Sequence, residues 1–347
     1  MSVVKEMFSR KRILPLLLIL AMIVVYNWRQ PTQLIELQGQ TFGTISYTIK
    51  YKDAQNRNFK SSIDSLLDVF NDAVSHYRPN SELSQFNKGS EVDFILPYLY
   101  TVLKASKHIY ETTHGGFNPA VMPLVNLWGF GPDSSIEPDS LLIDSIRQFT
   151  KMELVKFDTR RAWKTDNRVQ LDFSAVAKGQ GVDVVLEFLK SKGITDAFVE
   201  IGGEVNTLGT NAYGDAWKIA ILDPASDVVN QRYIAVVDLQ DKAVATSANN
   251  FNYVIKNGVR YSHTLNSFTG YPTENNILSA SVFANNCMTA DAYATAFMAL
   301  GHEKAIEIAE KQSEIDIFLV FSAPDGSTKT YLSESLKDVF HQQENDN

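Results

Sequence analysis

The sequence contains only one cysteine in 347 residues, Cys287. A single thiol excludes an internal disulfide and any metal cluster built on several cysteines. The chain also lacks an excess of basic residues, because 32 Lys and Arg face 40 Asp and Glu, which gives a formal net charge of -8. This balance argues against a general electrostatic attraction to nucleic acid, although a local basic pocket is compatible with it.

Several common catalytic and nucleotide-binding motifs are also missing. The sequence has no GxxxxGK phosphate loop, no HExxH zinc helix, no GxSxG elbow and no CxxC pair. The stretch "GFGPDS" begins like a dinucleotide-binding fingerprint, but it lacks the third glycine and a preceding strand. Internal repeats, low-complexity segments and a clear interdomain linker are absent too. Any function must therefore be sought in isolated polar residues.

Apolar residues are abundant enough for a large core. Hydrophobic residues make up 44% of the chain and aromatic residues 11%. This content excludes a disordered protein and predicts either one large domain or two intertwined ones.

The first 32 residues differ from the rest of the chain. A basic stretch precedes an apolar run at 13–26, which ends close to Trp28. The pattern is typical of a secretion signal or of an uncleaved membrane anchor, and a buried core helix is the third alternative. No small-x-small cleavage site follows, and the aromatic ending favours the anchor. No cysteine follows either, which excludes a lipid-modified start.

The anchor interpretation predicts the topology of the whole chain. Residues 1–32 would form a cytoplasmic basic stub and a single membrane span, since basic flanks stay inside. Residues 33–347 would then form the functional domain on the periplasmic or extracytoplasmic side of the inner membrane.

The body mixes strands with helices. Residues 42–51 alternate polar and apolar side chains, which predicts a strand, while 61–77 and 96–112 have helical patterns. Loops are predicted at 78–90 and at 113–135, where glycines and prolines interrupt regular structure.

The segment 168–193 predicts a strand, a turn and a helix that Ser174 caps and that ends at Gly193. The apolar face of this helix consists of Val182, Val185, Leu186 and Leu189. A strand at 197–209 is interrupted by two adjacent glycines, where a ligand could approach closely.

Further strands with turn signals follow, and 315–333 predicts a hairpin that turns at Pro324 to Gly326. The whole pattern indicates an α+β fold, with mixed, mostly antiparallel sheets and packed helices rather than a regular βαβ array.

The stretch "TADAYATAFMALG", residues 289–301, predicts a buried helix with Thr289 as its cap. Asp291 is unusual in this apolar setting. Its carboxylate would lie in the first turn, with the Thr295 hydroxyl four residues later on the same face. One interpretation is favourable placement at a helix start. The other is a site for a hard cation, which prefers oxygen ligands.

Two other polar residues have competing interpretations. Lys178 lies at the start of the helix that follows Ser174, where free backbone N–H groups favour a phosphate, although a solvent-facing lysine is the alternative. His263 lies between a strand and a turn, where it could be a general base, a phosphate donor or a structural residue.

Eight motifs together resemble one family, the FAD:protein FMN transferases, or ApbE-type flavin transferases. The resemblance runs from about Thr41 to the C-terminal hairpin, with the motifs in the order and spacing of that family. They are "FGTISY", "SHYRPNSELSQFN", "GGFNPAVMPLVNLWGFG", "LDFSAVAKGQGVD", "VEIGGEV", "AVATSANNFNY", "YSHTLNSFTGYP" and "TADAYATAFMALG".

The resemblance implies an ApbE-type fold and a magnesium-dependent enzyme outside the cytoplasm. Such an enzyme splits FAD, attaches FMN through a phosphoester to a threonine of a target protein and releases AMP. By this similarity, Asp291, Thr295 and the backbone carbonyl of Ala175 are expected to bind Mg²⁺. An oxygen-only magnesium site would neutralise the charge that develops during phosphoryl transfer.

The resemblance also implies residues that bind FAD. Lys178 is expected at the phosphates, and His263 corresponds to the family histidine proposed to activate the acceptor hydroxyl. Phe42 corresponds to a position that packs on the flavin. The other expected FAD contacts are Tyr77, Glu82, Leu83, Ser84 and Asn118.

The chain departs from the family pattern at three places. Asn118 stands where the family usually has Asp, which keeps hydrogen bonding but removes a charge. Asn266 and Ser267 replace a frequent Asp-Pro, so that a carboxylate able to orient His263 is absent. "SANNFNY" replaces a more usual Ser-Gly start.

The resemblance further implies that the acceptors are membrane respiratory or electron-transport subunits whose flavin sites face outward. Two other functions use the same pocket and stay open at this point. One is an FAD-binding or delivery protein without transfer, and the other is an FAD pyrophosphatase that yields FMN and AMP.

Overall fold

The computed structural model describes residues 34–131, 138–226, 230–248, 253–256, 259–262, 264–273 and 275–342. The expected anchor at 1–32 and the candidate base His263 lie outside the described residues, so both stay predictions. Among the helices that are described, none combines the length and hydropathy needed to cross a bilayer.

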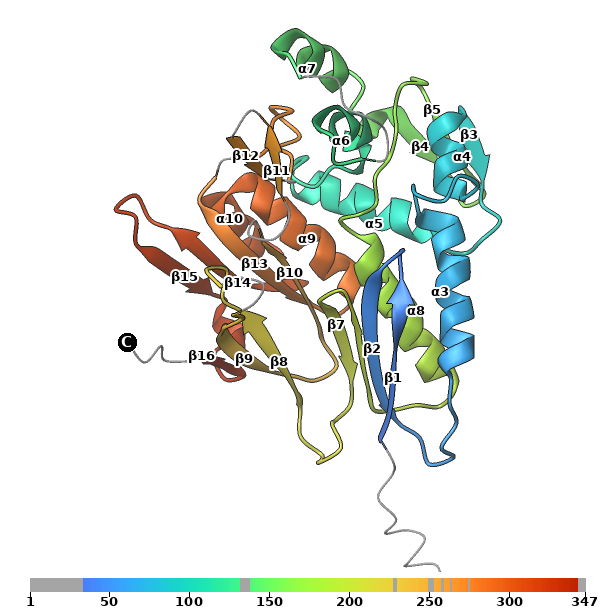
Figure 1. Cartoon of the computed structure of the whole chain (residues 1–347), viewed down its shortest axis with the longest axis vertical. Coiled ribbons are helices and arrows are strands. Elements are labelled where there is room, and N and C mark those ends of the chain that lie inside the picture. The colour runs from blue at the N-terminus through green and yellow to red at the C-terminus, as the bar shows by residue number, and fades with distance from the viewer. Residues whose placement is uncertain are drawn as a thin grey trace, which may run out of the picture.

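An eight-stranded sheet forms the centre of the fold (Figure 1), and all its neighbouring strands are antiparallel. In spatial order its strands are β1 (Leu34–Thr41), β2 (Ile45–Lys52), β6 (Ala197–Ile201), β7 (Glu204–Leu208), β10 (Ala243–Ala248), β13 (Ile277–Ala284), β14 (Ile315–Ser322) and β15 (Thr328–Leu332).

Three smaller antiparallel sheets accompany it. Their strands are β3 (Glu91–Asp93), β5 (Arg161–Lys164) and β4 (Val155–Phe157) in one, β16 (Phe340–Gln342), β9 (Tyr233–Leu239) and β8 (Trp217–Leu222) in the second, and β11 (Tyr253–Lys256) and β12 (Val259–Ser262) in the third.

The helices are α3 (Lys60–Val74), α4 (Glu82–Lys88), α5 (Leu99–Thr112), α6 (Met122–Trp128), α7 (Ser140–Arg147), α8 (Ala177–Ser191), α9 (Cys287–Leu300) and α10 (His302–Lys311). Short 3₁₀ turns lie at Pro119–Val121, Met152–Leu154 and Glu334–Leu336. Helix α9 contacts β10, β13 and α8, while α8 contacts β6 and β7, so these two helices cover one face of the large sheet (Figure 1).

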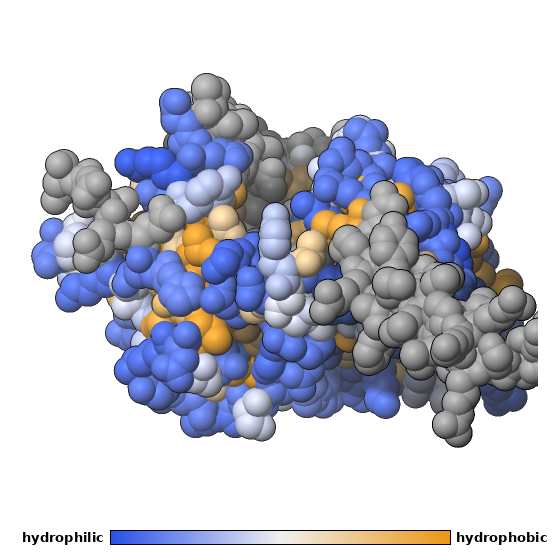
Figure 2. All heavy atoms as spheres, turned by 90° about the horizontal axis from the view of Figure 1, so that it is seen from below, coloured by the Kyte–Doolittle hydropathy of each residue, from blue (hydrophilic) through white to orange (hydrophobic). Residues whose placement is uncertain are grey.

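The sheet that contains β8 packs on the opposite face. Val205 and Val244 of the large sheet share an apolar cluster with Ile219 of β8 and Val237 of β9. The region around β7 and β10 is therefore layered as helices, large sheet and small sheet. The face of the molecule seen from below is mainly hydrophilic, with small apolar areas between the polar ones (Figure 2).

The α+β class and the mostly antiparallel pairing are confirmed. Helix α8 buries all four residues of its predicted apolar face, because their spacing places them on one side of the helix. The hairpin turn at 324–326 joins β14 to β15 as predicted.

Two predicted helix caps are wrong. Asn286, not Thr289, caps α9, because its side chain accepts the N–H of Thr289. Ser174 lies before α8, and its N–H and hydroxyl both bond to Asp172 instead. Asp291 consequently lies beyond the first turn of α9, where capping does not explain it.

Two predicted loops contain short helices. Helix α4 lies within 78–90, where Ser81 caps it through the N–H of Ser84. Helix α6 lies within 113–135 and ends at Gly129, whose left-handed backbone suits glycine. Both helices have only seven residues, too few to produce a clear periodic pattern.

Candidate functional site

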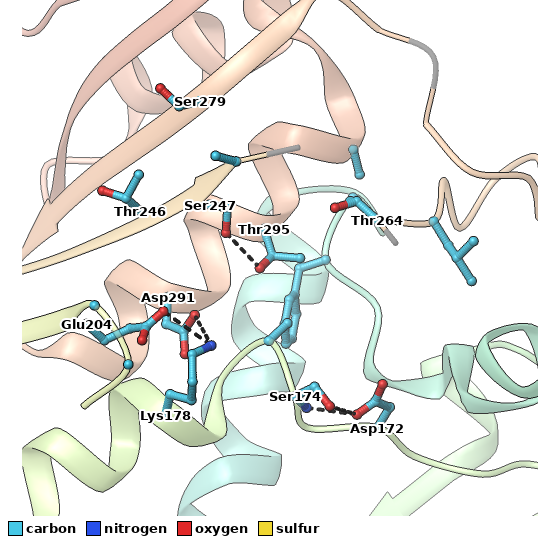
Figure 3. A pocket seen from close by; sticks show the side chains of 18 of the residues that line it. Asp172, Ser174, Lys178, Glu204, Thr246, Ser247, Thr264, Ser279, Asp291 and Thr295 are labelled. Atoms are coloured by element: carbon cyan, nitrogen blue, oxygen red, sulfur yellow. Dashed lines mark hydrogen bonds and ion pairs between the residues drawn. The ribbon is translucent and has the colours of Figure 1, made fainter. Parts of the chain in front are cut away.

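A cavity of about 480 Å³ lies where the start of α8, the middle of α9 and the edges of β7, β8 and β10 meet. Figure 3 shows Lys178, Glu204 and Asp291 facing one another in this cavity, with Ser247 and Thr295 beside them. Segments that are far apart in the sequence thus combine into one polar wall.

A glycine allows α8 and α9 to approach closely at this wall. The N–H of Gly179 donates to Oδ2 of Asp291 over 3.0 Å. A Cβ atom at Gly179 would lie 2.4 Å from the carbonyl oxygen of Cys287 and 2.9 Å from the Cβ of Asp291. Only glycine fits at this crossing, which fixes the direction of the Asp291 carboxylate.

Asp183 holds the start of α9 in place. Its carboxylate accepts the N–H groups of Cys287 and Met288 over 2.8 and 2.9 Å, and it also accepts the side-chain amide of Asn206. Burial raises the pKa of Asp183 to about 6, against the lowering effect of these donors. No local pattern in the sequence indicates this role, because the partners of Asp183 come from two distant elements.

We expect Asp183→Ala to lower the free energy of unfolding by about 2 to 4 kcal/mol, because it leaves helix-end N–H groups and a buried amide without an acceptor. Urea denaturation measures this loss. Glu187→Ala on the same helix removes only an exposed pair with Lys190 and should change stability by less than about 0.5 kcal/mol. Equal effects of the two substitutions would contradict this role of Asp183.

Lys178 is placed between two buried carboxylates. Its Nζ lies 3.2 Å from Oε1 of Glu204 and 3.9 Å from Oδ1 of Asp291. Burial lowers the pKa of Lys178, but the two carboxylates outweigh it and raise the pKa above its ordinary value. The ion pairs with Glu204 and Asp291 direct the ammonium group of Lys178 into the cavity, which excludes the alternative of a freely solvent-facing lysine.

Glu204 is a site residue that the sequence analysis did not identify. It lies directly after the Gly202–Gly203 turn, its side chain is only 6% exposed, and burial raises its pKa. Its Oε2 atom is buried and has no hydrogen-bond partner among the described residues. An unpartnered buried oxygen that faces a cavity is typical of a site that binds a ligand.

The oxygens near Asp291 suit a hard cation. Asp291, Thr295 and Ala175 all line the cavity, and the Thr295 hydroxyl lies 3.3 Å from the Ser247 hydroxyl. Gly179 occupies Oδ2 of Asp291, which leaves Oδ1 directed toward Lys178. Carboxylate, hydroxyl and carbonyl oxygens are the donor set that Mg²⁺ prefers.

No group of three or more His, Cys, Asp or Glu side chains suited to a metal gathers in the described part of the chain. A divalent ion at Asp291 would therefore depend on hydroxyl and carbonyl oxygens and on oxygens of its substrate. Mg²⁺ sites of this composition commonly use substrate phosphates.

A second polar group lies on the same cavity wall around Asp172 (Figure 3). Its Oδ1 accepts the N–H and hydroxyl of Ser174 over 2.8 and 2.6 Å and lies 3.3 Å from Nδ1 of His76. Burial opposes the charge on Asp172, but His76 and Ser174 hold its pKa below the usual range. Tyr77 adjoins His76, with ring centroids 4.1 Å apart, and is 65% exposed.

Of the other predicted FAD contacts, some line the cavity and some do not. Asn118 lines the cavity, although its amide also donates to the Thr150 carbonyl and accepts the Ala120 N–H. Phe42 is not among the residues that line the cavity. Its ring packs beside Gly181 of α8, where an added Cβ atom would lie 3.2 Å from the ring.

Glu82, Leu83 and Ser84 are buried in α4 and do not line the cavity. Oε1 of Glu82 accepts the N–H groups of Ile95 and Leu96 over 2.8 and 2.7 Å. In this structure they stabilise the loop, and their contact with FAD stays a prediction.

The loop after position 263 is held in place by two of the departing residues. Oδ1 of Asn266 accepts the N–H groups of Phe268 and Thr269, and the Ser267 hydroxyl donates to the Gly115 carbonyl. Asn266 therefore stabilises the turn that follows position 263.

The family model of the ApbE family matches residues 42–319. The chain belongs to the ApbE family. It is 36% identical over 326 residues to the FAD:protein FMN transferase of Vibrio cholerae, which spans 91% of this chain and 96% of that protein. The protein of the same name from Haemophilus influenzae is 33% identical and covers 86% of this chain and 89% of its own length.

Solved structures agree with this membership. The flavin transferase ApbE of Vibrio cholerae superposes with a TM-score of 0.79 at 35% identity and covers 89% of this chain and 100% of its own. The apo flavinyl transferase ApbE of Pseudomonas stutzeri gives a TM-score of 0.77 at 30% identity, with 88% and 96% covered. The ApbE-type fold expected from the motifs is confirmed.

Proposed function

We propose that this ApbE family member is an FAD:protein FMN transferase, a flavinyltransferase that uses FAD as its FMN donor. The observation that carries the proposal is the cavity in which Lys178, Glu204 and Asp291 face one another beside a helix start. The names of the relatives support the reaction.

Lys178 and the start of α8 supply the positive charge that a diphosphate requires, and a bound Mg²⁺ would offset the carboxylates of Asp291 and Glu204. The ammonium group of Lys178 and the positive end of the α8 dipole attract the phosphates of FAD. Glu204 and Asp291 hold Lys178 at the cavity wall, so a bound diphosphate meets a fixed cation rather than a flexible one. Positioning and fixed charge are the main contributions of a protein to phosphoryl transfer.

The transfer breaks the phosphoanhydride bond between the two phosphates of FAD and forms a phosphoester with the acceptor. The oxygen of an acceptor threonine forms a bond to the phosphorus that carries the riboflavin part of FAD. The bond from this phosphorus to the bridging oxygen breaks, and AMP leaves with that oxygen. The hydroxyl proton passes to a general base, and His263 is the residue we predict for this step.

Asp291, Thr295 and the carbonyl of Ala175 would hold Mg²⁺. When bound, the ion supplies positive charge that neutralises the charge developing on the phosphates. The protein groups around it have their own tasks: Gly179 fixes Asp291, and Ser247 contacts Thr295.

The acceptor and the location extend the proposal. The acceptors are membrane respiratory or electron-transport subunits with an outward-facing threonine near their flavin site. The chain is attached to the inner membrane by residues 1–32, with its catalytic domain, 33–347, on the periplasmic or extracytoplasmic side.

One experiment separates this function from the two others that use the same cavity. The full-length chain in detergent is incubated with FAD, Mg²⁺ and a candidate acceptor, and flavin fluorescence is measured on the denatured acceptor. Retained fluorescence indicates transfer. Free FMN without a labelled protein would indicate a pyrophosphatase, and unchanged FAD would indicate a binding or delivery protein.

We expect Lys178→Met to lower kcat/KM for FAD by about 100-fold, because it removes the fixed cation that meets the diphosphate. Steady-state kinetics of AMP release in the presence of acceptor measure this change. Lys190→Met on the same helix removes an exposed lysine paired with Glu187 and provides the matched control. A Lys178 variant as active as this control would contradict the phosphate role.

A further inference from the structure

Strand β8 forms one edge of its three-stranded sheet, whose order is β16-β9-β8 (Figure 1). Its outer side pairs with none of the other described strands. Such an edge presents main-chain N–H and C=O groups to which another extended segment can bind.

The register shows which groups point outward. The N–H of Asp238 donates to the Val339 carbonyl over 2.9 Å, so Asp238 directs its main chain away from β8. Lys218 lies opposite Asp238 in the antiparallel register, and Ala220 follows two residues later. The N–H and C=O groups of Lys218 and Ala220 therefore face the outer edge, since hydrogen-bonded and non-hydrogen-bonded pairs alternate.

This edge is continuous with the candidate site. Ala220, Ile221 and Leu222 line the same cavity as Lys178 and Asp291. The Lys218 ammonium lies 3.0 Å from Asp238 across the β8–β9 ladder, which keeps this side chain over the sheet rather than beyond its edge. Ala220 is small and exposed, which permits the close approach of a second backbone.

We infer that the acceptor protein docks as an extended segment that adds as a strand to β8. This inference rests on the proposed function and identifies how its protein substrate is held. Main-chain hydrogen bonds to Lys218 and Ala220 hold the segment, and side-chain alternation directs every second residue toward the cavity. A threonine at one of these cavity-facing positions of the segment reaches the phosphates of bound FAD. The residues farther along the segment do not affect this placement.

N-methylated peptides test this docking with the unmodified enzyme. The probe is a pool of synthetic twelve-residue peptides with one central threonine, from which the most rapidly flavinylated peptide is chosen. Single N-methyl groups are then introduced at each position. We expect labelling to fall by about tenfold at alternate positions, where an N–H faces β8, and by less than about twofold between them.

A profile without this alternation would overturn the inference, as would FMN transfer to whole acceptor proteins with no peptide labelled. These outcomes leave the proposed function intact. Failure to label any protein in a membrane extract, with FAD and Mg²⁺ present, would instead contradict the proposed function itself.

A proline substitution tests the enzyme side. Ala220→Pro removes one outward N–H and should raise the KM for the chosen peptide by about tenfold, while the KM for FAD reports any distortion of the cavity. The matched control is Thr330→Pro in β15, which is also an edge strand of its sheet among the described strands. The pairing of Val320 with Thr330 likewise leaves the N–H of Thr330 on the outer side, and Thr330 does not line the candidate cavity.

An unchanged peptide KM in folded Ala220→Pro would overturn the inference. Sedimentation could also show that the wild-type chain is a dimer. If Ala220→Pro dissociated this dimer without changing the peptide KM, the inference would be overturned as well. That result would assign the edge of β8 to a second copy of the chain instead.

Discussion

Replacing Asp291 by alanine abolishes FMN transfer while the protein stays folded. The expected loss in kcat is at least about 1,000-fold, because the substitution removes the only carboxylate among the proposed metal ligands. Helix α9 persists, since Asn286 and Asp183 still bond to its first N–H groups. Transfer assays with FAD, Mg²⁺ and acceptor measure the activity, and circular dichroism verifies the fold.

The metal itself provides a second readout for this prediction. Calorimetric titration with Mg²⁺ and FAD should detect metal-dependent binding to the wild-type chain and none to Asp291→Ala. Glu187→Ala, at an exposed position on α8, is the control and should behave as wild type. Full activity or unchanged Mg²⁺ binding in Asp291→Ala would refute the metal assignment.

We expect the replacement of Gly179 by alanine to destabilise the protein and to inactivate it. The new Cβ would lie 2.4 Å from the carbonyl oxygen of Cys287, which belongs to the backbone and cannot rotate away. Helices α8 and α9 must then separate, at a cost of about 3 kcal/mol, and Asp291 loses the N–H that orients it. Thermal denaturation and transfer assays measure the two effects.

Gly181→Ala on the same helix is the matched control. Its Cβ would meet the ring of Phe42 at 3.2 Å, and a side chain can move by the few tenths of an ångström required. We expect a loss of stability below about 1 kcal/mol and a much smaller loss of transfer than in Gly179→Ala, because Asp291 keeps the N–H that orients it. If both glycine substitutions had the same effect, the close crossing at Gly179 would not explain the site.

The sequence predicted those parts of the site that lie in long regular elements or in family motifs. The apolar spacing of α8 identified its buried face, and the odd carboxylate in an apolar helix singled out Asp291. The place of Asp291 relative to the start of its helix was predicted less accurately. Asp291 lies beyond the first turn because Asn286, three residues before Thr289, has the side chain that bonds back to the helix.

Glu204 and Asp183 could not be recognised from the sequence alone. A glutamate after two glycines is an ordinary feature of a turn, and its significance comes from Lys178, which belongs to another element. Asp183 lies on a helix that is partly exposed, yet its partners are the first residues of α9 and a side chain of β7. Tertiary contacts of this kind have no local signal in the chain.

Glu82 has a structural role that its motif did not indicate, and its contact with FAD stays a prediction. Its motif implied a contact with FAD, whereas its carboxylate bonds to the backbone of Ile95 and Leu96, away from the cavity.

Mass spectrometry of the acceptor after reaction tests the central claim most directly. The full-length chain, FAD, Mg²⁺ and acceptor are incubated, and intact mass, modified residue and nucleotide products are determined together. We predict a mass increase equal to FMN less one water on a threonine, with one AMP released for each acceptor modified. An unmodified acceptor alongside equal amounts of free FMN and AMP would contradict the account.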